Sequence, residues 1–400
     1  MPWADILGAA GLPLHDVREI GVKGPLAGVR VVESASFITG PYCGQLLADL
    51  GADVIKVESP DGGDPFRSFA GSLYAPHFIA YNRNKRSAAV DIRSERGQRV
   101  MRALLERADV FVENYRPGVM DRLGFGYETV REWNRRLIYC SISGMGRGGP
   151  YAERPAYDTV GQALSGMLSQ LVERERPRIV GPAFSDGVTG LTVAYAILAA
   201  LLARERTGEG QRVDVSMLEA TTAFMTSEAT YYFRLGEEGG PRLRPALSQA
   251  YAFTCQDGAI IAIQLSSLGK FWEALARAVE RPDLLADARF ATRLDRVQHV
   301  EALQELLAAE FRKRPRAEWL RILQTRDVPH APAYTFGEVF EDPQARHLGL
   351  RLELRHPTEG TVATVAPPVR FSATPWGELA APPTLGEHTA DILRELGLAE

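Results

Sequence analysis

The 400-residue sequence is poor in the residues that hold structural metals. It has only three cysteines, Cys43, Cys140 and Cys255, which lie far apart and form no CxxC pair. Its seven histidines show neither an HExxH motif nor any other paired spacing. Three scattered cysteines are also a poor basis for a disulfide framework. These absences favour a reduced, cytoplasmic protein and argue against a metal site.

An excess of positive charge and long apolar runs are absent too. A formal net charge of −4 gives no support for binding to nucleic acid or to an anionic membrane. Residues 1–24 contain early acidic side chains and lack the basic-then-apolar order of a signal peptide. The apolar run at 188–203 is shorter than the roughly 20 residues of a membrane span. It predicts a buried core helix, and we expect no nucleic-acid or membrane partner.

Several catalytic and nucleotide-binding motifs are also missing. The chain has no GxGxxG or GxxxxGK[ST] pattern, which weakens a dinucleotide or P-loop interpretation. It has no GxSxG nucleophile elbow and no Ser-His-Asp order. The common signatures of a dehydrogenase, a nucleoside triphosphatase and a serine hydrolase are therefore absent.

What the sequence does contain is a repeated alternation of short β-branched runs and helical periodicity. Strands are expected at 28–33, 53–58, 109–114 and 138–144, with helices at 40–52, 96–108 and 127–137 between them. Strands joined through helices form parallel, right-handed βαβ units. The pattern predicts an α/β fold with an open, parallel, Rossmann-like sheet.

The regular alternation of strand and helix patterns ends near residue 225. The chain of 400 residues is also longer than the roughly 250–300 residues at which a single hydrophobic core stops growing. A strand is expected at 258–265 and charged amphipathic helices at 270–325. We therefore expect the N-terminal part of a large domain at 1–225 and a smaller α+β domain at 226–330. The segment 331–400 is expected to return, complete the large domain and wrap a partner, with its Pro-rich stretch 366–388 as extended chain.

Three stretches offer small or basic residues beside expected strand ends, where open α/β sheets bind ligands. They are "ITGPYCG" (38–44), "YNRNKRSAAVDIRS" (81–94) and "ENYRPGVMDRLGFGYE" (113–128). Their basic side chains suit an anionic phosphate ligand. A solvated charged face, or an ordinary strand-to-helix loop, explains the same residues, and local sequence does not separate these interpretations.

Asp186 is the most unusual acidic residue. It stands in "VGPAFSDGVTG" (180–190) with no Lys or Arg within seven residues on either side. One interpretation is that Asp186 caps the helix that follows, since Asp often accepts a hydrogen bond from an unpaired N–H of the first turn. The other is that Asp186 is a nucleophile. The local stretch alone leaves both open.

Over most of its length the sequence resembles the class III CoA-transferases, which include formyl-CoA, carnitine and bile-acid CoA-transferases. The resemblance starts near residue 24 and rests on six motifs in order and on "LGEHT" near the end. The motifs are "GPLAGVRVVE…ITGPYCGQLLADLGADVIKVE", "NRNKRSAAVDI", "ADVFVENYRPGVMDRLGFGYE", "RPAYDTVGQALSGM", "SDGVTG" and "TGEGQRVDVSMLEA". The resemblance implies an interlocked, ring-like homodimer that needs no metal or organic cofactor beyond coenzyme A as substrate.

The same resemblance assigns roles to residues. The catalytic aspartate of the family falls on Asp186, which would form an aspartyl anhydride and then an aspartyl-CoA thioester. Arg93, Arg116 and Arg122 would be natural ligands for the phosphates of CoA. The CoA contacts of the family match Ile38, Thr39, Val90, Asp91, Ile92, Arg93, Asn114, Tyr115, Arg116, Arg122, Arg154, Pro155, Ala156, Tyr157 and Asp158.

Two departures bear on the substrate. Formyl-CoA transferase has Gln at the place of Ile38 and a tetraglycine loop where this chain has "GEEGGPRLRP" (236–245), so formyl-CoA and oxalate are not assumed. A racemase branch of the family has His in place of Tyr157, and the Tyr favours transfer over racemisation.

The expected reaction moves CoA from an acyl-CoA thioester to a carboxylic acid acceptor. That acceptor is expected to be a small dicarboxylate, whose distal carboxylate Arg83, Arg242 or Arg244 would neutralise. The alternatives are an acyl-CoA α-epimerase and a CoA-binding protein without catalysis.

Overall fold

The computed structural model describes residues 24–71, 74–266 and 269–398. Residues 1–23, on which the expectation of no signal peptide falls, lie outside the described part. The described chain forms two compact units. The first runs to Ser165, resumes over Gly181–Met225 and includes the chain from Gly349 onward. The second comprises Gly166–Val180 and Thr226–Leu348, so it also contains a segment before 226 and extends past the expected boundary at 330.

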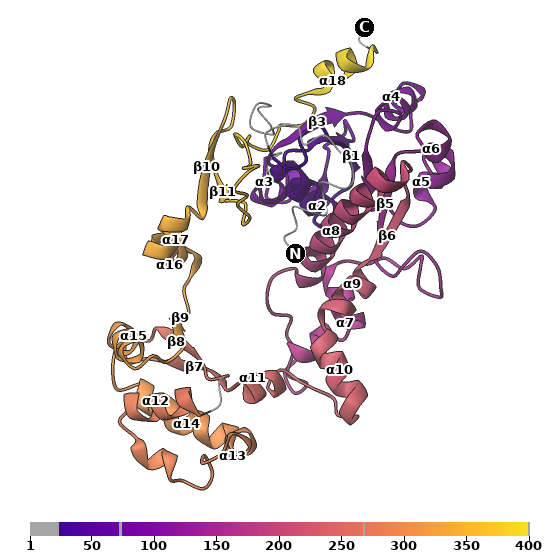
Figure 1. The fold of residues 1–400 in the computed structure, drawn as a ribbon. Helices are drawn as coiled ribbons and strands as arrows, with labels where there is room; N and C mark the ends of the chain where they lie inside the picture. Colours follow the sequence, from indigo (N-terminus) through magenta and orange to yellow (C-terminus); the bar gives the residue numbers. More distant parts are fainter. Residues whose placement is uncertain (1–23, 72–73, 267–268, 399–400) are drawn as a thin grey trace, which may run out of the picture. The chain divides into compact units, whose positions relative to one another are not determined.

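The first unit is built on a six-stranded parallel sheet, as the alternating pattern predicted (Figure 1). Its strand order is β3-β2-β1-β4-β5-β6. The strands are β1 (Arg30–Ser34), β2 (Asp53–Glu58), β3 (Lys85–Ala89), β4 (Val110–Glu113), β5 (Ile138–Ser143) and β6 (Arg212–Ser216). Chain order reverses between β1 and β4, and such a reversal opens a crevice at the carboxyl ends of the strands.

Helices cover both faces of this sheet, so consecutive strand residues are buried on opposite sides. Val31 joins the core beneath α2 and α8, whereas Val32 joins the core beneath α4 and α18. The helices of the first unit are α2 (Thr39–Asp49), α3 (Pro76–Tyr81), α4 (Glu95–Leu105), α5 (Val119–Arg122), α6 (Tyr127–Trp133), α7 (Asp158–Leu164), α8 (Phe184–Thr207), α9 (Met217–Phe224) and α18 (Thr389–Leu396), with a 3-10 turn at Pro65–Arg67.

Helix α8 is the apolar run that predicted a core helix. Val193, Ile197 and Ala200 of one face are buried in the core beside α2. Among the described residues, α8 alone is long and apolar enough to cross a membrane by length and composition. A core helix of a soluble fold passes the same test, so this finding is weak evidence for a span.

The second unit packs helices against a small antiparallel sheet of order β7-β8-β9. Its aromatic core stacks Phe253 on Phe311, with ring centroids 4.6 Å apart, and places Trp319 against Phe311. Its elements are a 3-10 turn (Met167–Gln170), α10 (Thr226–Leu235), α11 (Leu243–Ser248), β7 (Ala250–Thr254), β8 (Ile260–Gln264), α12 (Lys270–Ala278), a second 3-10 turn (Pro282–Leu285), α13 (Arg293–Gln298), α14 (Val300–Phe311), α15 (Arg316–Thr325), β9 (His330–Pro332), α16 (Phe336–Glu341) and α17 (Pro343–Leu348).

The C-terminal segment returns to the first unit. It forms the hairpin β10 (Arg351–His356) and β11 (Gly360–Val365), and then has no further helix or strand before α18. The extended part lies along β3, where the Gly386 amide donates to Ser87 Oγ. Helix α18 begins beside the same strand, where the His388 amide donates to the Ser87 carbonyl and the Ala89 amide to Thr389 Oγ1. This contact covers the exposed edge of the sheet, which would otherwise be open to pairing.

Candidate active site

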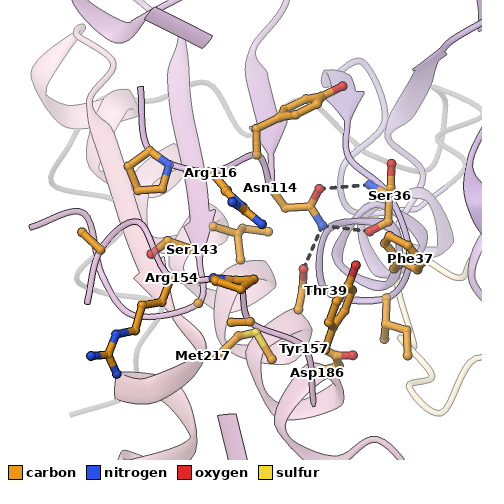
Figure 2. A pocket seen from close by; sticks show the side chains of 18 residues that line it. Ser36, Phe37, Thr39, Asn114, Arg116, Ser143, Arg154, Tyr157, Asp186 and Met217 are labelled. Atoms are coloured by element: carbon orange, nitrogen blue, oxygen red, sulfur yellow. Dashed lines mark hydrogen bonds between the residues drawn. The ribbon is translucent and has the colours of Figure 1, made fainter. Parts of the chain in front are cut away.

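A cavity of about 340 Å³ opens at the carboxyl ends of β1, β4 and β5, beside the reversal in strand order (Figure 2). The loops Ser36–Thr39 after β1 and Asn114–Pro117 after β4 form two of its walls. The end of β5 and the loop 154–157 form further walls, and Asp186 and Met217 come from the starts of α8 and α9. Open α/β folds bind ligands at this place.

Asn114 fixes the loop that leads from β1 into α2. Its Oδ1 accepts from the Ser36 amide at 3.0 Å, while its Nδ2 donates to the Ser36 carbonyl at 2.8 Å and to Thr39 Oγ1 at 3.1 Å. A Cβ on Gly40 would lie 2.3 Å from Ala35 Cβ, so only glycine allows this close turn. No side chain caps α2 at Ile38. The free N–H groups of its first turn, next to the cavity, can therefore serve a ligand.

Phe37 has a backbone conformation that is unusual for a residue with a side chain. Its φ is +65°, in the left-handed region, and its amide donates to Asp64 Oδ1 at 3.2 Å. Its ring packs edge-on between Phe66 and Tyr157, with centroids 5.3 and 5.7 Å away. Such backbone strain persists only where the surroundings enforce it, often at functional sites. No local sequence signal predicted this role for Phe37.

Asp186 lies in the first turn of α8, and its side chain faces the cavity (Figure 2). The N-cap of α8 is Ala183, and no side chain caps the helix. The capping interpretation is therefore wrong, because Asp186 stands three residues inside. Among the residues that the structure describes, none forms a hydrogen bond or an ion pair with the Asp186 carboxylate.

The environment of Asp186 makes it a weak acid. Burial, and then the negative charge of Asp158, raise its pKa from 3.8 to about 7. Both effects disfavour the charged carboxylate. Asp158 Oδ1 accepts a hydrogen bond from the Asp186 amide at 3.2 Å. A carboxylate with a strongly raised pKa in a cavity is typical of a reactive group.

Contacts with α9 and α2 fix the first turns of α8. Ser185 is fully buried, and its Oγ lies 2.7 Å from Thr221 Oγ1 of α9. A Cβ on Gly190 would lie 3.0 Å from Tyr42 Cδ1, so this glycine serves the packing of α8 on α2. A Cβ on Gly187 would meet nothing within 4 Å, which leaves open space beside Asp186.

A family model described as CoA-transferase family III matches residues 26–389. The chain belongs to this family. It is 36% identical to mouse (Mus musculus) succinyl-CoA:glutarate CoA-transferase, over 93% of this chain and 86% of that protein. It is 35% identical to succinate–glutarate CoA-transferase of Agrobacterium fabrum, over 94% and 97%. A solved CAIB/BAIF family protein from Brucella suis superposes with a TM-score of 0.84 at 36% identity, over 94% and 100%.

Ten of the predicted site residues of this CoA-transferase line the cavity. They are Ile38, Thr39, Asn114, Tyr115, Arg116, Arg154, Pro155, Ala156, Tyr157 and Asp186. The loop of Arg154 lies against β5 because Gly144 has no side chain, since a Cβ there would be 2.2 Å from Ala156 Cβ. The Arg154 guanidinium stacks on the Tyr151 ring, 3.7 Å from its centroid.

The other predicted residues do not line this cavity. Val90 is buried in the core, and its amide donates to the Glu58 carbonyl. Asp91, Ile92 and Arg93 form the turn after β3, in which Asp91 Oδ1 accepts from the Arg93 amide. Arg122 ends α5, with Nη1 close to Gly118, which follows the cavity-lining Pro117. Asp158 starts α7 and turns its carboxylate toward α8.

Arg93 and Arg122 are exposed, and neither forms an ion pair with another residue of the described chain. Seven lining residues were not predicted besides Phe37. They are Ser36, Pro117, Ile142, Ser143, Gly144, Ala152 and Met217. The positions of Ser36 and Pro117 next to predicted loop residues could have suggested them, whereas Met217 lies in the motif "TGEGQRVDVSMLEA" without a contact having been assigned to it.

The basic run at 83–86 is structural in this CoA-transferase, and the expectation that Arg83 neutralises a substrate carboxylate is wrong. Arg83 is buried, pairs through two nitrogens with Asp49 and donates to the Val365 carbonyl. Lys85 is buried against Glu33. Asp49 is buried as well, and an unpaired buried charge is costly. The cation at position 83 therefore serves to neutralise Asp49.

The two arginines predicted in the second unit differ from each other. Arg242 is exposed and pairs with Glu173 and Glu301. Arg244 lines a separate cavity of about 220 Å³ and has no ion-pair partner among the described residues. Residues 24–71, 74–266 and 269–398 contain no cluster of three or more His, Cys, Asp or Glu side chains that could hold a metal.

Proposed function

We propose that this enzyme moves CoA from an acyl-CoA thioester to a small dicarboxylic acid through covalent intermediates on Asp186. The observation that carries the proposal is the unpaired carboxylate of Asp186 in the cavity at the strand ends. Family membership supports CoA transfer. The relatives named for succinate, glutarate and oxalate support a dicarboxylate acceptor.

The proposed reaction begins with attack of an Asp186 oxygen on the donor thioester carbonyl. The carbon–sulfur bond breaks, CoA thiolate leaves, and a mixed anhydride remains on Asp186. The thiolate then attacks the aspartyl carbonyl, which releases the donor acid and leaves an aspartyl-CoA thioester. The acceptor carboxylate displaces the thiolate to form a second anhydride. Attack of the thiolate on the acceptor carbonyl finally gives the new acyl-CoA and free Asp186.

The surroundings of Asp186 suit this chemistry. A paired cation would stabilise the carboxylate and lower its nucleophilicity, and no such pair exists among the described residues. The raised pKa of Asp186, about 7, makes its carboxylate a stronger nucleophile than an ordinary aspartate. The free N–H groups that begin α2 can stabilise the oxyanion of each tetrahedral intermediate.

The proposed CoA site extends from this cavity to the neighbouring basic residues. The cavity would take the pantetheine end, with Arg116 in its wall. Arg93 and Arg122, both exposed and without an ion-pair partner in the described chain, would bind the phosphates. Arg83 is bound to Asp49 and Arg242 to two glutamates, so neither of these two arginines is available for the distal carboxylate of the acceptor.

We also propose an interlocked homodimer that acts in the cytoplasm, uses no cofactor beyond CoA, and binds no nucleic acid or membrane. Leu191, Tyr195 and Leu202 of α8 are exposed, although large apolar side chains on a helix are usually covered. Light scattering should therefore give twice the chain mass. Charged substitutions at Tyr195 and Leu202 should lower that mass, whereas a monomeric wild type would contradict the dimer.

Replacement of the nucleophile tests the proposed reaction directly. Asp186→Ala should lower the rate of transfer from succinyl-, acetyl- or formyl-CoA to a panel of acids by about 10⁴-fold or more, as loss of a nucleophile does elsewhere. Mass spectrometry should detect a hydroxylamine-sensitive adduct on Asp186 in the wild type only. Near-normal turnover of the variant would overturn the assignment. Deuterium entering the α-carbon without an acceptor acid would indicate an epimerase instead.

A further inference from the structure

Two helices begin side by side next to the proposed nucleophile. Helix α7 starts at Asp158, and Asp186 lies in the first turn of α8. A Cβ on Gly161 would lie 2.3 Å from Ser185 Oγ, so α7 packs directly on α8 only because this residue is glycine. This close contact, one turn along α7, places the Asp158 carboxylate beside Asp186.

Both oxygens of Asp158 are engaged by neighbouring donors. Oδ1 accepts from the Asp186 amide at 3.2 Å, and Oδ2 accepts from Gln162 Nε2 at 2.5 Å. Gln162 is buried, and its Oε1 has no hydrogen-bond partner among the described residues. Neither Asp158 nor Asp186 forms an ion pair within the described chain. Two acidic side chains therefore lie together without a compensating cation.

We propose that Asp158 is a positioning residue, which fixes the first turn of α8 and places a second negative charge beside the nucleophile. This role rests on the proposed function, in which Asp186 is acylated. Asp158 does not line the cavity, so it acts through Asp186 and not by contact with substrate.

The physical effect is a relief of charge repulsion during the reaction. Two neighbouring carboxylates repel each other, whereas the anhydride and the thioester on Asp186 are neutral. Each acylation of Asp186 therefore removes an unfavourable interaction with Asp158. This repulsion favours the step from free enzyme to covalent intermediate.

The other charged or titratable groups near Asp186 do not replace Asp158. Burial, and then the charge of Asp186, raise the pKa of Tyr81 of α3, while Tyr42 of α2 contacts α8 one turn further on, at Gly190. Tyr157, Arg116 and Arg154 line the cavity. The helix α9 contributes Met217 and Thr221, which carry no charge. Asp158 is thus the acidic group that accepts directly from the Asp186 backbone.

Asp158→Asn separates the charge of Asp158 from its hydrogen bonds. The amide oxygen of the variant can still accept from the Asp186 amide. The Gln162 amide can turn, so that its unpartnered Oε1 accepts from the new Nδ2. The variant should therefore fold. The acidic limb of the pH dependence of kcat/KM, near pH 7 in the wild type, should move down by about one unit.

Two further variants complete the test. Asp158→Ala removes the charge and the acceptor, so its acidic limb should shift equally while its kcat falls further than that of Asp158→Asn. Glu153→Gln removes one negative charge from the exposed loop that precedes α7 and should leave the pH profile unchanged. The KM for the donor should change little in all three, because none of these side chains lines the cavity.

The outcomes separate this proposal from the proposed function. Absence of a hydroxylamine-sensitive adduct on wild-type Asp186 would overturn the covalent mechanism. A wild-type adduct together with an unmoved acidic limb in Asp158→Asn and Asp158→Ala would overturn only the role of Asp158. A downward shift in both variants, with an unchanged Glu153→Gln profile, would support it.

Discussion

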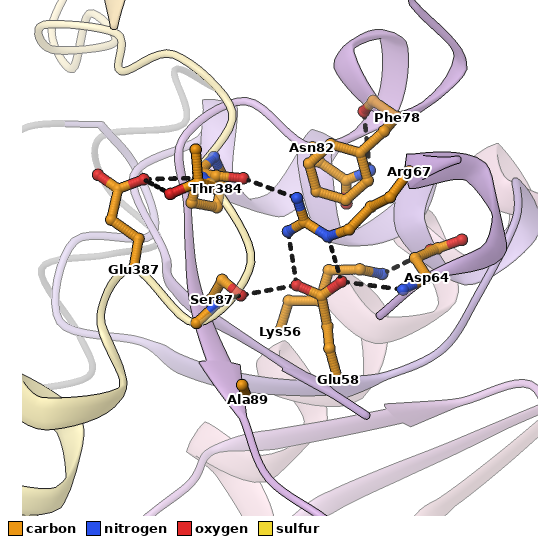
Figure 3. Close-up of polar contacts among 12 residues, drawn as sticks. Lys56, Glu58, Asp64, Arg67, Phe78, Asn82, Ser87, Ala89, Thr384 and Glu387 are labelled. Atoms are coloured by element: carbon orange, nitrogen blue, oxygen red, sulfur yellow. Dashed lines mark hydrogen bonds and ion pairs between the residues drawn. The ribbon is translucent and has the colours of Figure 1, made fainter. Parts of the chain in front are cut away.

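Two regions of the first unit differ in how they surround a carboxylate that is shielded from water: Glu58 is buried, and Asp186 is half-buried. Glu58 forms a bidentate ion pair with Arg67, whose Nε and Nη2 each lie 2.7 Å from a carboxylate oxygen of Glu58 (Figure 3). The Ser87 hydroxyl donates to the same carboxylate. Burial alone would raise the pKa of Glu58, but these hydrogen bonds and the charge of Lys56 hold it below its usual value. Asp186 has no cation beside it, and its pKa rises to about 7.

The comparison shows what separates a structural acid from a reactive one. Both groups lose water, and the difference is whether a donor of opposite charge replaces that water. Around Glu58 the replacement is complete, and Arg67 also stacks on Phe78 and donates to the Pro383 carbonyl of the returning segment. Around Asp186 the nearest charged hydrogen-bond partner of the backbone is itself an acid, Asp158.

Removing the cation that pairs with Glu58 should have the largest effect on stability. Arg67→Met would leave Glu58 buried without its ion-pair partner and release the Pro383 contact. We expect the free energy of unfolding to fall by about 3–5 kcal/mol, measured by urea denaturation. The control is Arg102→Met, which removes an exposed pair with Glu106 and should cost less than about 1 kcal/mol. Equal effects of the two variants would contradict the comparison.

Neutralising the unpaired acid should change stability in the opposite direction. Because the folded state raises the pKa of Asp186, the folded protein holds its proton up to about pH 7, while the unfolded chain loses it near 3.8. The contribution of Asp186 to stability is therefore lost as pH rises from about 4 to about 7.

Asp186→Asn should accordingly match the wild type near pH 4 and be more stable by about 1–2 kcal/mol near pH 8, allowing for solvent in the open cavity. Denaturation at both pH values measures the difference. A variant that is less stable than the wild type near pH 8 would contradict it.

A cation supplied to Asp186 should make it resemble Glu58. Gly187 is next in α8, and a side chain there would start in open space. Gly187→Arg should lower the pKa of Asp186 and its nucleophilicity, whereas Gly187→Met has similar bulk without charge. We expect kcat of the Arg variant to be about tenfold below that of the Met variant, with an acidic limb at lower pH. Equal pH profiles would show that bulk alone acts.

Much of the site could be predicted, because its motifs are local. The strand-to-helix loops after β1 and β4 were expected from short segments, and the structure places them at one cavity. The absence of a basic residue around Asp186 in the sequence corresponds to its lack of an ion pair in the described chain. The cap was wrongly considered because helix α8 begins two residues before Asp186.

The basic residues were less predictable. Arg83 and Arg93 look alike in the sequence, yet Arg83 is buried against Asp49, 34 residues away, while Arg93 is exposed. Local sequence contains no sign of that distant partner. Phe37 was missed for a similar reason, since its strained φ depends on Asp64, Phe66 and Tyr157, which come from two other places in the chain.

The sequence by itself determined the α/β alternation, the family and the aspartate at the start of the apolar helix, because each of these depends on residues close together in the chain. Only the tertiary structure decided which charges are paired and which acid stands beside Asp186. Asp158 and Asp186 are 28 positions apart, and they meet because Gly161 lets two helices touch. Electrostatic effects depend on distance in space and on burial, and both arise only when the chain has folded.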